Sequence, residues 1–227
     1  KKVFFQTGGS EANEAAFKMA RQYHLQSGHP TKYKVISHWM GYHGATAAAL
    51  SASGRLGRRV RFEPLMPGFI HVAPPYCYRC FFGQKYPSCG ILCAQDVARI
   101  MELEGPETVS AYISEPMSGS GGQNIPPPEY FEKISQICKE NNVLLIMDEI
   151  ITGFGRTGKM FAMSHYNARP DILVLGKGLT GGYAPLSAVV TTEAIFNAFY
   201  TERDKDKFDH VITYVGNPVS CAAGLKA

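Results

Sequence analysis

Several features are missing from this chain of 227 residues, and each absence excludes a class of protein. No run of about eighteen apolar residues occurs, so we expect no transmembrane helix. No signal peptide is visible either. The formal net charge is only +4, and the lysines and arginines are spread along the chain. The sequence therefore favours neither a membrane protein nor a nucleic-acid-binding protein.

Two common nucleotide-binding motifs are also absent. The glycines of the segment TGGSEANEA (7–15) do not have the G-x-G-x-x-G spacing of a dinucleotide-binding loop. A P-loop is excluded because Lys177 is followed by Gly rather than by Ser or Thr. The chain has no initiator Met, opens in a strand-like segment and closes within a helical pattern, so we interpret it as an internal piece of a longer protein.

What is present is an alternation of apolar, strand-like runs with helical patterns. This alternation predicts an α/β fold, a three-layer α/β/α domain with a mostly parallel mixed sheet. After a short strand-like VFF, a long helix starts with Ser10 as its N-cap. The other expected strands cover residues 34–39, 69–73, 109–116, 143–150, 171–176 and 185–192, and the other expected helices cover residues 45–53, 95–104, 128–142, 193–203 and 218–227.

Three short segments at strand ends are candidate binding sites. Gly8, Gly9 and Ser10 precede a helix, whose first N–H groups and dipole could hold a phosphate. The segment Tyr42-His43-Gly44 offers an aromatic ring for stacking, and Glu115 ends another strand. Taken alone, each has a simpler interpretation, namely a capped turn, a surface loop and a solvated strand end.

The two most informative residues are Asp148 and Lys177. Asp148 follows five apolar residues, so we expect it to be buried and to need a charged or hydrogen-bonded partner, such as a protonated pyridine nitrogen or a metal ion. Lys177 lies between two glycines after a buried strand, so its amine could be partly desolvated and nucleophilic, although a surface lysine is the alternative. A carboxylate and a lysine at neighbouring strand ends are what pyridoxal phosphate chemistry requires.

With these motifs in order, the sequence resembles the class III aminotransferases, which are fold-type I pyridoxal-phosphate enzymes. The resemblance extends over nearly the whole chain and is strongest in residues 146–182, which contain M-D-E-I, G-F-G-R-T-G, D-I-L and G-K-G-L-T-G-G. It implies that residues 1–210 form part of a large cofactor-binding domain and that residues 211–227 lead toward a small C-terminal domain. A cytoplasmic location is also expected.

The resemblance implies pyridoxal 5'-phosphate as the cofactor and assigns a role to each matching position. Lys177 would be the Schiff-base lysine and proton shuttle, and Asp148 the partner of the pyridine nitrogen. The other implied contacts are Tyr42 stacked on the ring with His43 beside it, Ile150 on the opposite ring face, Gly9 and Ser10 in the phosphate cup, Glu115 near the ring hydroxyl, and Thr213 at the phosphate of the neighbouring subunit's cofactor. The last contact implies a homodimer with shared active sites.

Within this family the chain is most similar to the omega-type enzymes. They pass an amino group from an amine or amino-acid donor to a keto acid, often pyruvate, in a ping-pong mechanism. The arginine that binds the substrate carboxylate would lie beyond Ala227. Another pyridoxal-phosphate reaction on the same scaffold, such as that of an aminomutase, an epimerase or a decarboxylase, is the nearest alternative.

Four cysteines lie close together in a loop, with the spacing C-x2-C-x8-C-x3-C. Such spacing is compatible with a tetrahedral structural zinc site, whereas packed, reduced thiols are the simpler interpretation. A zinc-stabilised binding module without catalysis is therefore the more distant functional alternative. The candidate metal ligands are Cys77, Cys80, Cys89 and Cys93.

Overall fold

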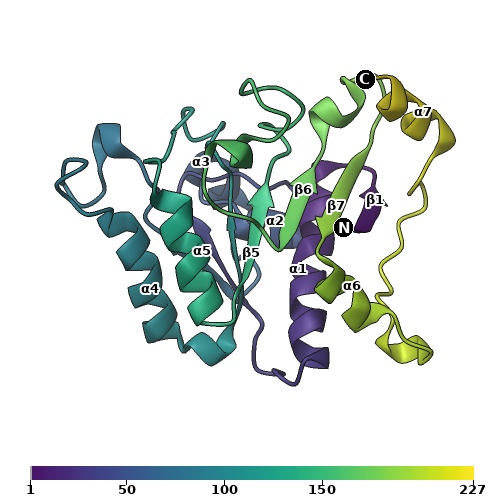
Figure 1. Cartoon of the computed structure of the whole chain (residues 1–227), viewed down its shortest axis with the longest axis horizontal. Helices are drawn as coiled ribbons and strands as arrows, with labels where there is room; N and C mark the ends of the chain where they lie inside the picture. Colours follow the sequence, from purple (N-terminus) through teal and green to yellow (C-terminus); the bar gives the residue numbers. More distant parts are fainter. Residues whose placement is uncertain (1) are drawn as a thin grey trace.

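Among residues 2–227, which the computed structural model describes, seven strands form one mixed sheet in the order β1-β7-β6-β5-β4-β2-β3 (Figure 1). Neighbouring strands from β3 to β6 are parallel, and β7 runs antiparallel to both β6 and β1. The mostly parallel mixed sheet predicted from the sequence is confirmed. The strands are β1 (Lys2–Gln6), β2 (Lys34–His38), β3 (Phe69–Val72), β4 (Val109–Ser114), β5 (Leu144–Asp148), β6 (Ile172–Leu175) and β7 (Ser187–Thr191).

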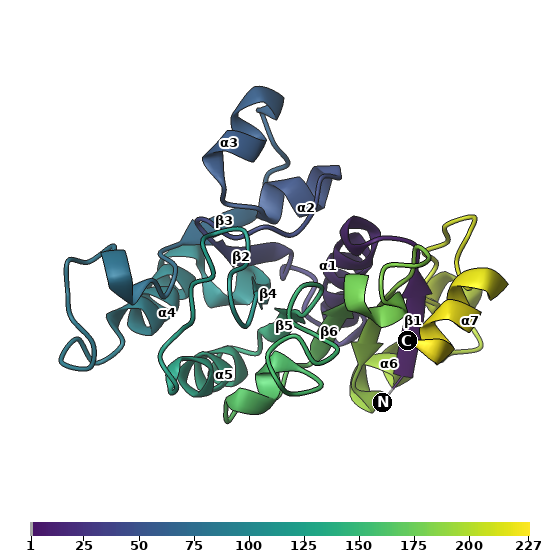
Figure 2. The same ribbon diagram turned by 90° about the horizontal axis from the view of Figure 1, so that it is seen from above.

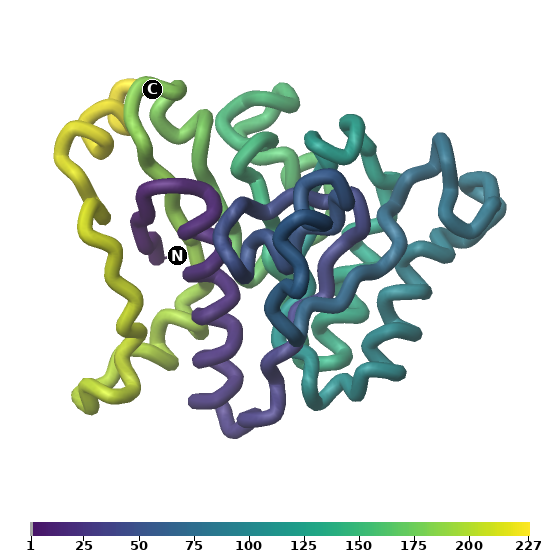
Figure 3. Tube along the Cα trace, turned by 180° about the vertical axis from the view of Figure 1, so that it is seen from behind, coloured from purple at the N-terminus to yellow at the C-terminus, as the bar shows by residue number. Residues whose placement is uncertain are grey.

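Helices cover both faces of the sheet. The long helix α1 lies on one face, together with α2 and α6, whereas α4 and α5 lie on the other (Figures 1 and 3). The short helix α3 projects away from the sheet (Figure 2). The helices are α1 (Gly9–Gln26), α2 (Ala47–Ala52), α3 (Leu56–Arg59), α4 (Leu92–Glu104), α5 (Tyr130–Glu140), α6 (Glu193–Phe199) and α7 (Pro218–Lys226).

The alternation of side chains along β5 divides the apolar core between the two faces. Leu144 and Ile146 belong to the cluster that contains α1, and Leu145 and Met147 belong to the cluster that contains α4 and α5. Because successive side chains of a strand point to opposite faces, the next residue, Asp148, points toward α1. The strand pattern therefore places this carboxylate beside the start of the long helix.

The start of α1 differs from the prediction. Gly8 occupies the N-cap position in an extended conformation, with φ −138° and ψ 165°, and makes no side-chain cap. Ser10 was predicted to be the N-cap, which is wrong: it lies inside the first turn, and its Oγ accepts a hydrogen bond from Ala45 N at 3.0 Å. A glycine can end the preceding strand and begin the helix without a side-chain acceptor.

The topology gathers the candidate residues at one edge of the sheet. The strands β2, β4, β5 and β6 are parallel, so their carboxyl ends meet there. Two reversals of direction, from β6 to β7 and from β7 to β1, bring the end of β1 to the same edge. Ligands bind at such edges in open α/β sheets.

Within residues 2–227, no helix combines the length and the apolar character that crossing a membrane would require.

Candidate active site

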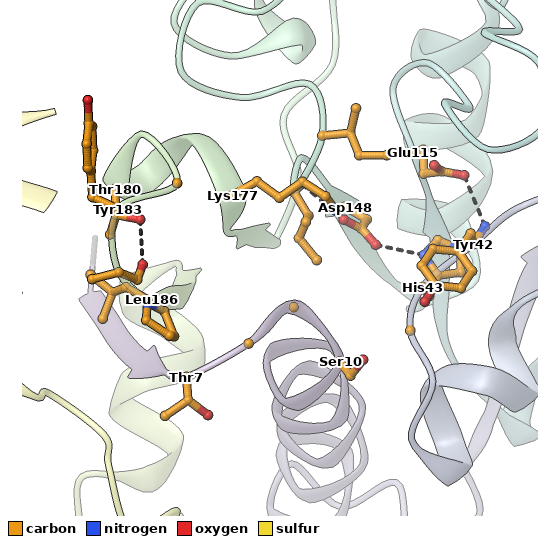
Figure 4. A pocket seen from close by; sticks show the side chains of 18 residues that line it. Thr7, Ser10, Tyr42, His43, Glu115, Asp148, Lys177, Thr180, Tyr183 and Leu186 are labelled. Carbon is orange, nitrogen blue, oxygen red and sulfur yellow. Dashed lines mark hydrogen bonds and ion pairs between the residues drawn. The ribbon is translucent and has the colours of Figure 1, made fainter. Parts of the chain in front are cut away.

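A cavity of about 410 Å³ opens at the carboxyl edge of the sheet (Figure 4). Its volume is within the range expected for a site that binds a small molecule. The segments after β1, β2, β4 and β5 contribute to its wall, and the connection between β6 and β7 completes it. The residues from the sequence prediction that line it are Gly9, Ser10, Tyr42, His43, Glu115, Asp148, Ile150 and Lys177.

Asp148 is held firmly in this cavity. Its side chain is 4% exposed. Its Oδ2 atom lies 2.9 Å from His43 Nδ1 and accepts a hydrogen bond from Asn13 Nδ2 at 3.0 Å. Its Oδ1 atom accepts a hydrogen bond from Ile150 N at 3.1 Å. These contacts from three directions fix the orientation of the carboxylate, as Figure 4 shows for the contact with His43.

Lys177 lies two residues after β6, in a left-handed backbone conformation with φ +40°. It begins a short 3-10 turn (Lys177–Thr180) and has Gly176 and Gly178 as neighbours. Lys177 is exposed, which fits the surface-lysine alternative. The chain turns away from the sheet at Gly176, so the side chain leaves the core and lies on the cavity wall. A positive φ at a residue other than glycine is strained and is often found at functional positions.

The first turn of α1 offers hydrogen-bond donors to the cavity. The first helical bond runs from Ala12 N to Gly8 O, so the N–H groups of Gly9, Ser10 and Glu11 have no partner within the helix. A Cβ atom at Gly9 would lie 2.7 Å from Ile150 Cδ1. A side chain at position 9 would therefore force the Ile150 side chain to shift. Free N–H groups at the positive end of an 18-residue helix favour an anion such as phosphate.

Glu115 stabilises the loop that carries Tyr42. Its Oε2 atom accepts hydrogen bonds from Tyr42 N at 3.2 Å and from Ser118 Oγ at 3.1 Å, and its Oε1 atom accepts one from Gly119 N at 3.3 Å. Burial raises the pKa of Glu115 to about 7; nearby His43 lowers this pKa, and the negative charge of Asp148 raises it. Glu115 therefore changes its protonation state near neutral pH.

The Tyr42 ring faces two regions of the molecule. It lines the cavity, and the guanidinium carbon of Arg58 lies 4.7 Å from its ring centroid in a cation–π contact. This contact joins the ring to the projecting helix α3. The aromatic residue predicted for ring stacking is thus held at the cavity wall by a second element of the fold.

Thr213 is the one predicted cofactor contact that the structure does not bring to this cavity. It is exposed and lies in a turn before α7. Within a single chain it is therefore apart from Asp148 and Lys177.

The four clustered cysteines line a second, narrow cavity and are all free thiols. In the described part of the chain, however, no three His, Cys, Asp or Glu side chains are arranged to hold a metal ion. The geometry of Cys77, Cys80, Cys89 and Cys93 therefore does not support the zinc site that their spacing suggested. Burial raises the pKa of the Cys93 thiol to about 12.

Several cavity residues were missed by the sequence reasoning. Thr180, Tyr183 and Leu186 line the wall between β6 and β7. Asn13 is completely buried in α1 and contacts Asp148 directly. A signal for Asn13 did exist, because it is a polar residue among the alanines of the buried helix face.

The residues present fit pyridoxal phosphate by their chemistry. The N–H groups at the start of α1 suit its phosphate, the fixed carboxylate of Asp148 suits its ring nitrogen, and the amine of Lys177 suits its aldehyde. All three groups lie around one cavity.

Comparison with known proteins gives consistent matches over the whole chain. The family model described as "Aminotransferase class-III" matches residues 1–227. An uncharacterized aminotransferase of Bacillus subtilis, YhxA, is 46% identical over 224 residues, which are 99% of this chain and 49% of the relative. A putrescine–pyruvate aminotransferase of Pseudomonas aeruginosa is 38% identical over 224 residues, which are 99% of this chain and 48% of the relative.

Two solved structures have the same fold. An (S)-enantioselective omega-transaminase from Thermomicrobium roseum superposes with a TM-score of 0.92 at 41% identity, covering 99% of this chain and 49% of that one. An amine transaminase from an uncultivated Pseudomonas species, in its PLP-bound form, superposes with a TM-score of 0.95 at 36% identity. The match covers 99% of this chain and 51% of that one. The chain spans about half the length of the curated relatives that it matches.

Proposed function

Because the chain belongs to the class III aminotransferases, we propose that it forms the cofactor-binding part of an enzyme that moves an amino group from an amine or amino-acid donor to a keto acid. The cofactor is pyridoxal 5'-phosphate, in line with the solved relative that binds it. We take pyruvate as the acceptor, which the name of the Pseudomonas aeruginosa relative supports. A ping-pong order follows, in which the deaminated donor leaves before the keto acid binds.

One observation carries this proposal. The fixed carboxylate of Asp148, the amine-bearing residue Lys177 and the free N–H groups at the start of α1 surround the same cavity. These groups come from three separate parts of the chain. Each group alone could be an ordinary strand end, a surface lysine or a capped turn. These simpler explanations do not account for the presence of all three groups around one cavity.

The residues of the chain then have distinct tasks. When bound, pyridoxal phosphate supplies an aldehyde that takes up the amino group and a ring that withdraws electrons from the substrate. Lys177 Nζ removes the proton from the substrate α-carbon as a general base and returns it as a general acid. Asp148 keeps the ring nitrogen protonated through a charge-assisted hydrogen bond. Tyr42 and Ile150, which both line the cavity, would contact the two faces of the ring.

We also propose that two copies of the chain form a homodimer in which each active site receives Thr213 from the partner copy. The exposed position of Thr213, outside the cavity of its own chain, supports this assignment. Residues 1–210 would be the large domain and residues 211–227 the start of the connection to a small domain. Mixing subunits that carry Thr213→Ala with subunits that carry Lys177→Ala tests the sharing. One wild-type site per mixed dimer, and hence partial activity, is expected only if Thr213 acts across the interface.

The first test is to trap the cofactor on the lysine. The full-length protein is incubated with pyridoxal phosphate, reduced with borohydride, digested and mapped by mass. We expect the label on the peptide that contains Lys177, and none in a Lys177→Ala variant. A folded protein without label, or with label spread evenly over surface lysines, would overturn the proposal.

A second measurement separates transamination from other pyridoxal-phosphate reactions. In transamination, consumption of pyruvate and formation of alanine match the amine consumed, mole for mole. An aminomutase, an epimerase or a decarboxylase would consume the amine compound without consuming a keto acid. The trapping experiment would give the same label in either case, so both measurements are needed.

A further inference from the structure

The side chain of Asn13 links the two loops that build the active site. It lies in the first half of α1 and is completely buried. Its Nδ2 atom donates a hydrogen bond to Asp148 Oδ2 at 3.0 Å and another to His43 O at 2.7 Å. Both donor positions of the amide are thereby used on groups that belong to the cavity. One helix residue therefore holds the end of β5 and the loop after β2 together.

The geometry around Asp148 makes the orientation of its carboxylate depend on Asn13. Oδ2 has His43 Nδ1 on one side and Asn13 Nδ2 on the other. Without the amide, Oδ2 would keep only the contact with His43, and rotation of the carboxylate about its last bond would be less restricted. Catalytic groups lose rate when their supporting hydrogen bonds are removed, even though those bonds touch no substrate.

A purely structural role does not account for this asparagine well. Its neighbours on the buried face of α1 are Ala12, Ala15 and Ala16, which pack without polar atoms. The Oδ1 atom of Asn13 is buried and has no hydrogen-bond partner among the described residues. Leaving a buried acceptor unpaired is unfavourable, so an apolar side chain would suit packing alone better. The two hydrogen bonds that the amide donates to the cavity are the compensating gain.

We propose that Asn13 is a positioning residue for the reaction: it fixes the Asp148 carboxylate toward the ring nitrogen of pyridoxal phosphate and ties the Tyr42–His43 loop to the same point. This inference rests on the proposed function, because it assigns Asn13 a task in that reaction. Asn13 itself touches neither substrate nor the reacting atoms. The titratable groups that face Asp148 are His43 and Glu115.

The test compares Asn13→Ala and Asn13→Asp with the parent, all as full-length protein. The readouts are kcat, the dissociation constant for pyridoxal phosphate, and the pH midpoint of the absorption change of the bound cofactor. For Asn13→Ala we expect kcat to fall roughly 10- to 100-fold and the pH midpoint to move by about half a unit or more, because the acid partner of the ring nitrogen is less well held. The matched control is Asn141→Ala, which removes an amide that donates only to Ile137 O at the end of α5.

Asn13→Asp keeps the volume of the side chain and so guards against a variant that fails to fold. It replaces a donor by a second carboxylate beside Asp148, so we expect a larger loss of kcat at high pH than at low pH. If both variants bind pyridoxal phosphate and titrate as the parent does, or if they lose only thermal stability, Asn13 is structural and the inference is wrong. Failure of the parent itself to be labelled at Lys177 would instead refute the proposed function, so the two failures are distinguishable.

Discussion

His43 Nδ1 lies 2.9 Å from Asp148 Oδ2, and both side chains are almost completely buried. An ionised carboxylate only accepts hydrogen bonds, so Nδ1 carries the proton in this pair. The resemblance to the aminotransferases placed His43 beside the tyrosine expected to stack on the ring; the structure adds that the His43 ring contacts the Asp148 carboxylate. His43 thus supports the Asp148 carboxylate together with Asn13.

Replacement of Asp148 by Asn should nearly abolish turnover while the protein still folds. An amide cannot stabilise a protonated ring nitrogen, and the loss of several kcal/mol of transition-state stabilisation corresponds to roughly a thousandfold or more in kcat. The rate is measured by the consumption of amine and pyruvate at saturating cofactor. Asp96→Asn, on α4 and away from the cavity, is the control and should keep the parent rate. A rate above about one-tenth of the parent in Asp148→Asn would remove this residue from its assigned role.

Gly44 should not tolerate even a methyl group. It has φ +145°, and a Cβ atom there would lie 2.5 Å from Ser10 Oγ and 2.7 Å from Ala49 Cβ. We expect Gly44→Ala to lower the free energy of unfolding by about 2–4 kcal/mol and to weaken cofactor binding, because the start of α1 must move.

The control for this substitution is Gly57→Ala in the projecting helix α3, where a Cβ atom would meet nothing within 4 Å. That variant should be as stable as the parent, within about 0.5 kcal/mol. Chemical denaturation and cofactor titration of both variants check the difference. Equal free energies of unfolding for the two variants would show that crowding against Ser10 does not destabilise Gly44→Ala.

Glu115 should make the stability of the cofactor-free protein depend on pH. Burial raises its pKa from 4.5 to about 7 in the folded protein. A carboxyl group with a raised folded pKa stabilises the fold fully below its unfolded pKa, and this contribution is lost as the pH rises through the folded value. We therefore expect the free energy of unfolding to fall by roughly 1–3 kcal/mol between about pH 4.5 and pH 7.5 through this one group.

The measurement compares the parent with Glu115→Gln across this pH range. The difference in unfolding free energy between the two proteins should change with pH, because the amide does not titrate. Glu102→Gln, at an exposed position of α4, should follow the parent curve in parallel. Parallel curves for Glu115→Gln as well would mean that this carboxyl group titrates normally in the folded protein.

Lys32 is expected to be the most costly lysine to replace. It is 3% exposed, and its Nζ atom donates to three backbone carbonyl oxygens, those of Pro106, Val109 and Asn141. Lys32→Met keeps most of the side-chain volume but leaves these acceptors without their donor, so a loss of about 2–4 kcal/mol in unfolding free energy follows. Lys133→Met, which removes an exposed contact with Gly90 O, should change stability by less than about 0.5 kcal/mol. Denaturant unfolding of the two variants measures this difference. Similar losses of unfolding free energy in both would contradict the prediction.

Local sequence patterns were sufficient to predict the strands and the residues at their ends. The apolar run before Asp148 predicted a buried strand with a carboxylate at its end, and the structure has it there. The alternation of strands and helices predicted the layered sheet. Both features depend on residues that are close in sequence, where periodicity is informative.

Contacts between distant segments could not be predicted in this way. Asn13 and Asp148 are 135 residues apart, and no spacing rule relates them. The exposure of Lys177 depends on the turn at Gly176 rather than on the strand before it. The cysteine spacing suggested a zinc site, but ligand geometry requires side-chain directions that a one-dimensional pattern does not contain.

The pairing of β1 with β7 also constrains how the molecule folds. Residues 2–6 lie at one end of the sheet order and pair with residues 187–191, from Lys2 opposite Thr191 to Gln6 opposite Ser187. Contacts of such long sequence separation form late. Closing the long intervening loop costs conformational entropy before the contacts add any stabilisation. The turn that offers its N–H groups to the cavity follows β1 directly, so its strand cannot dock until β7 has been synthesised. During translation the turn at the start of α1 should therefore reach its final position only after β7 has been made, although it leaves the ribosome before the other loops that line the cavity.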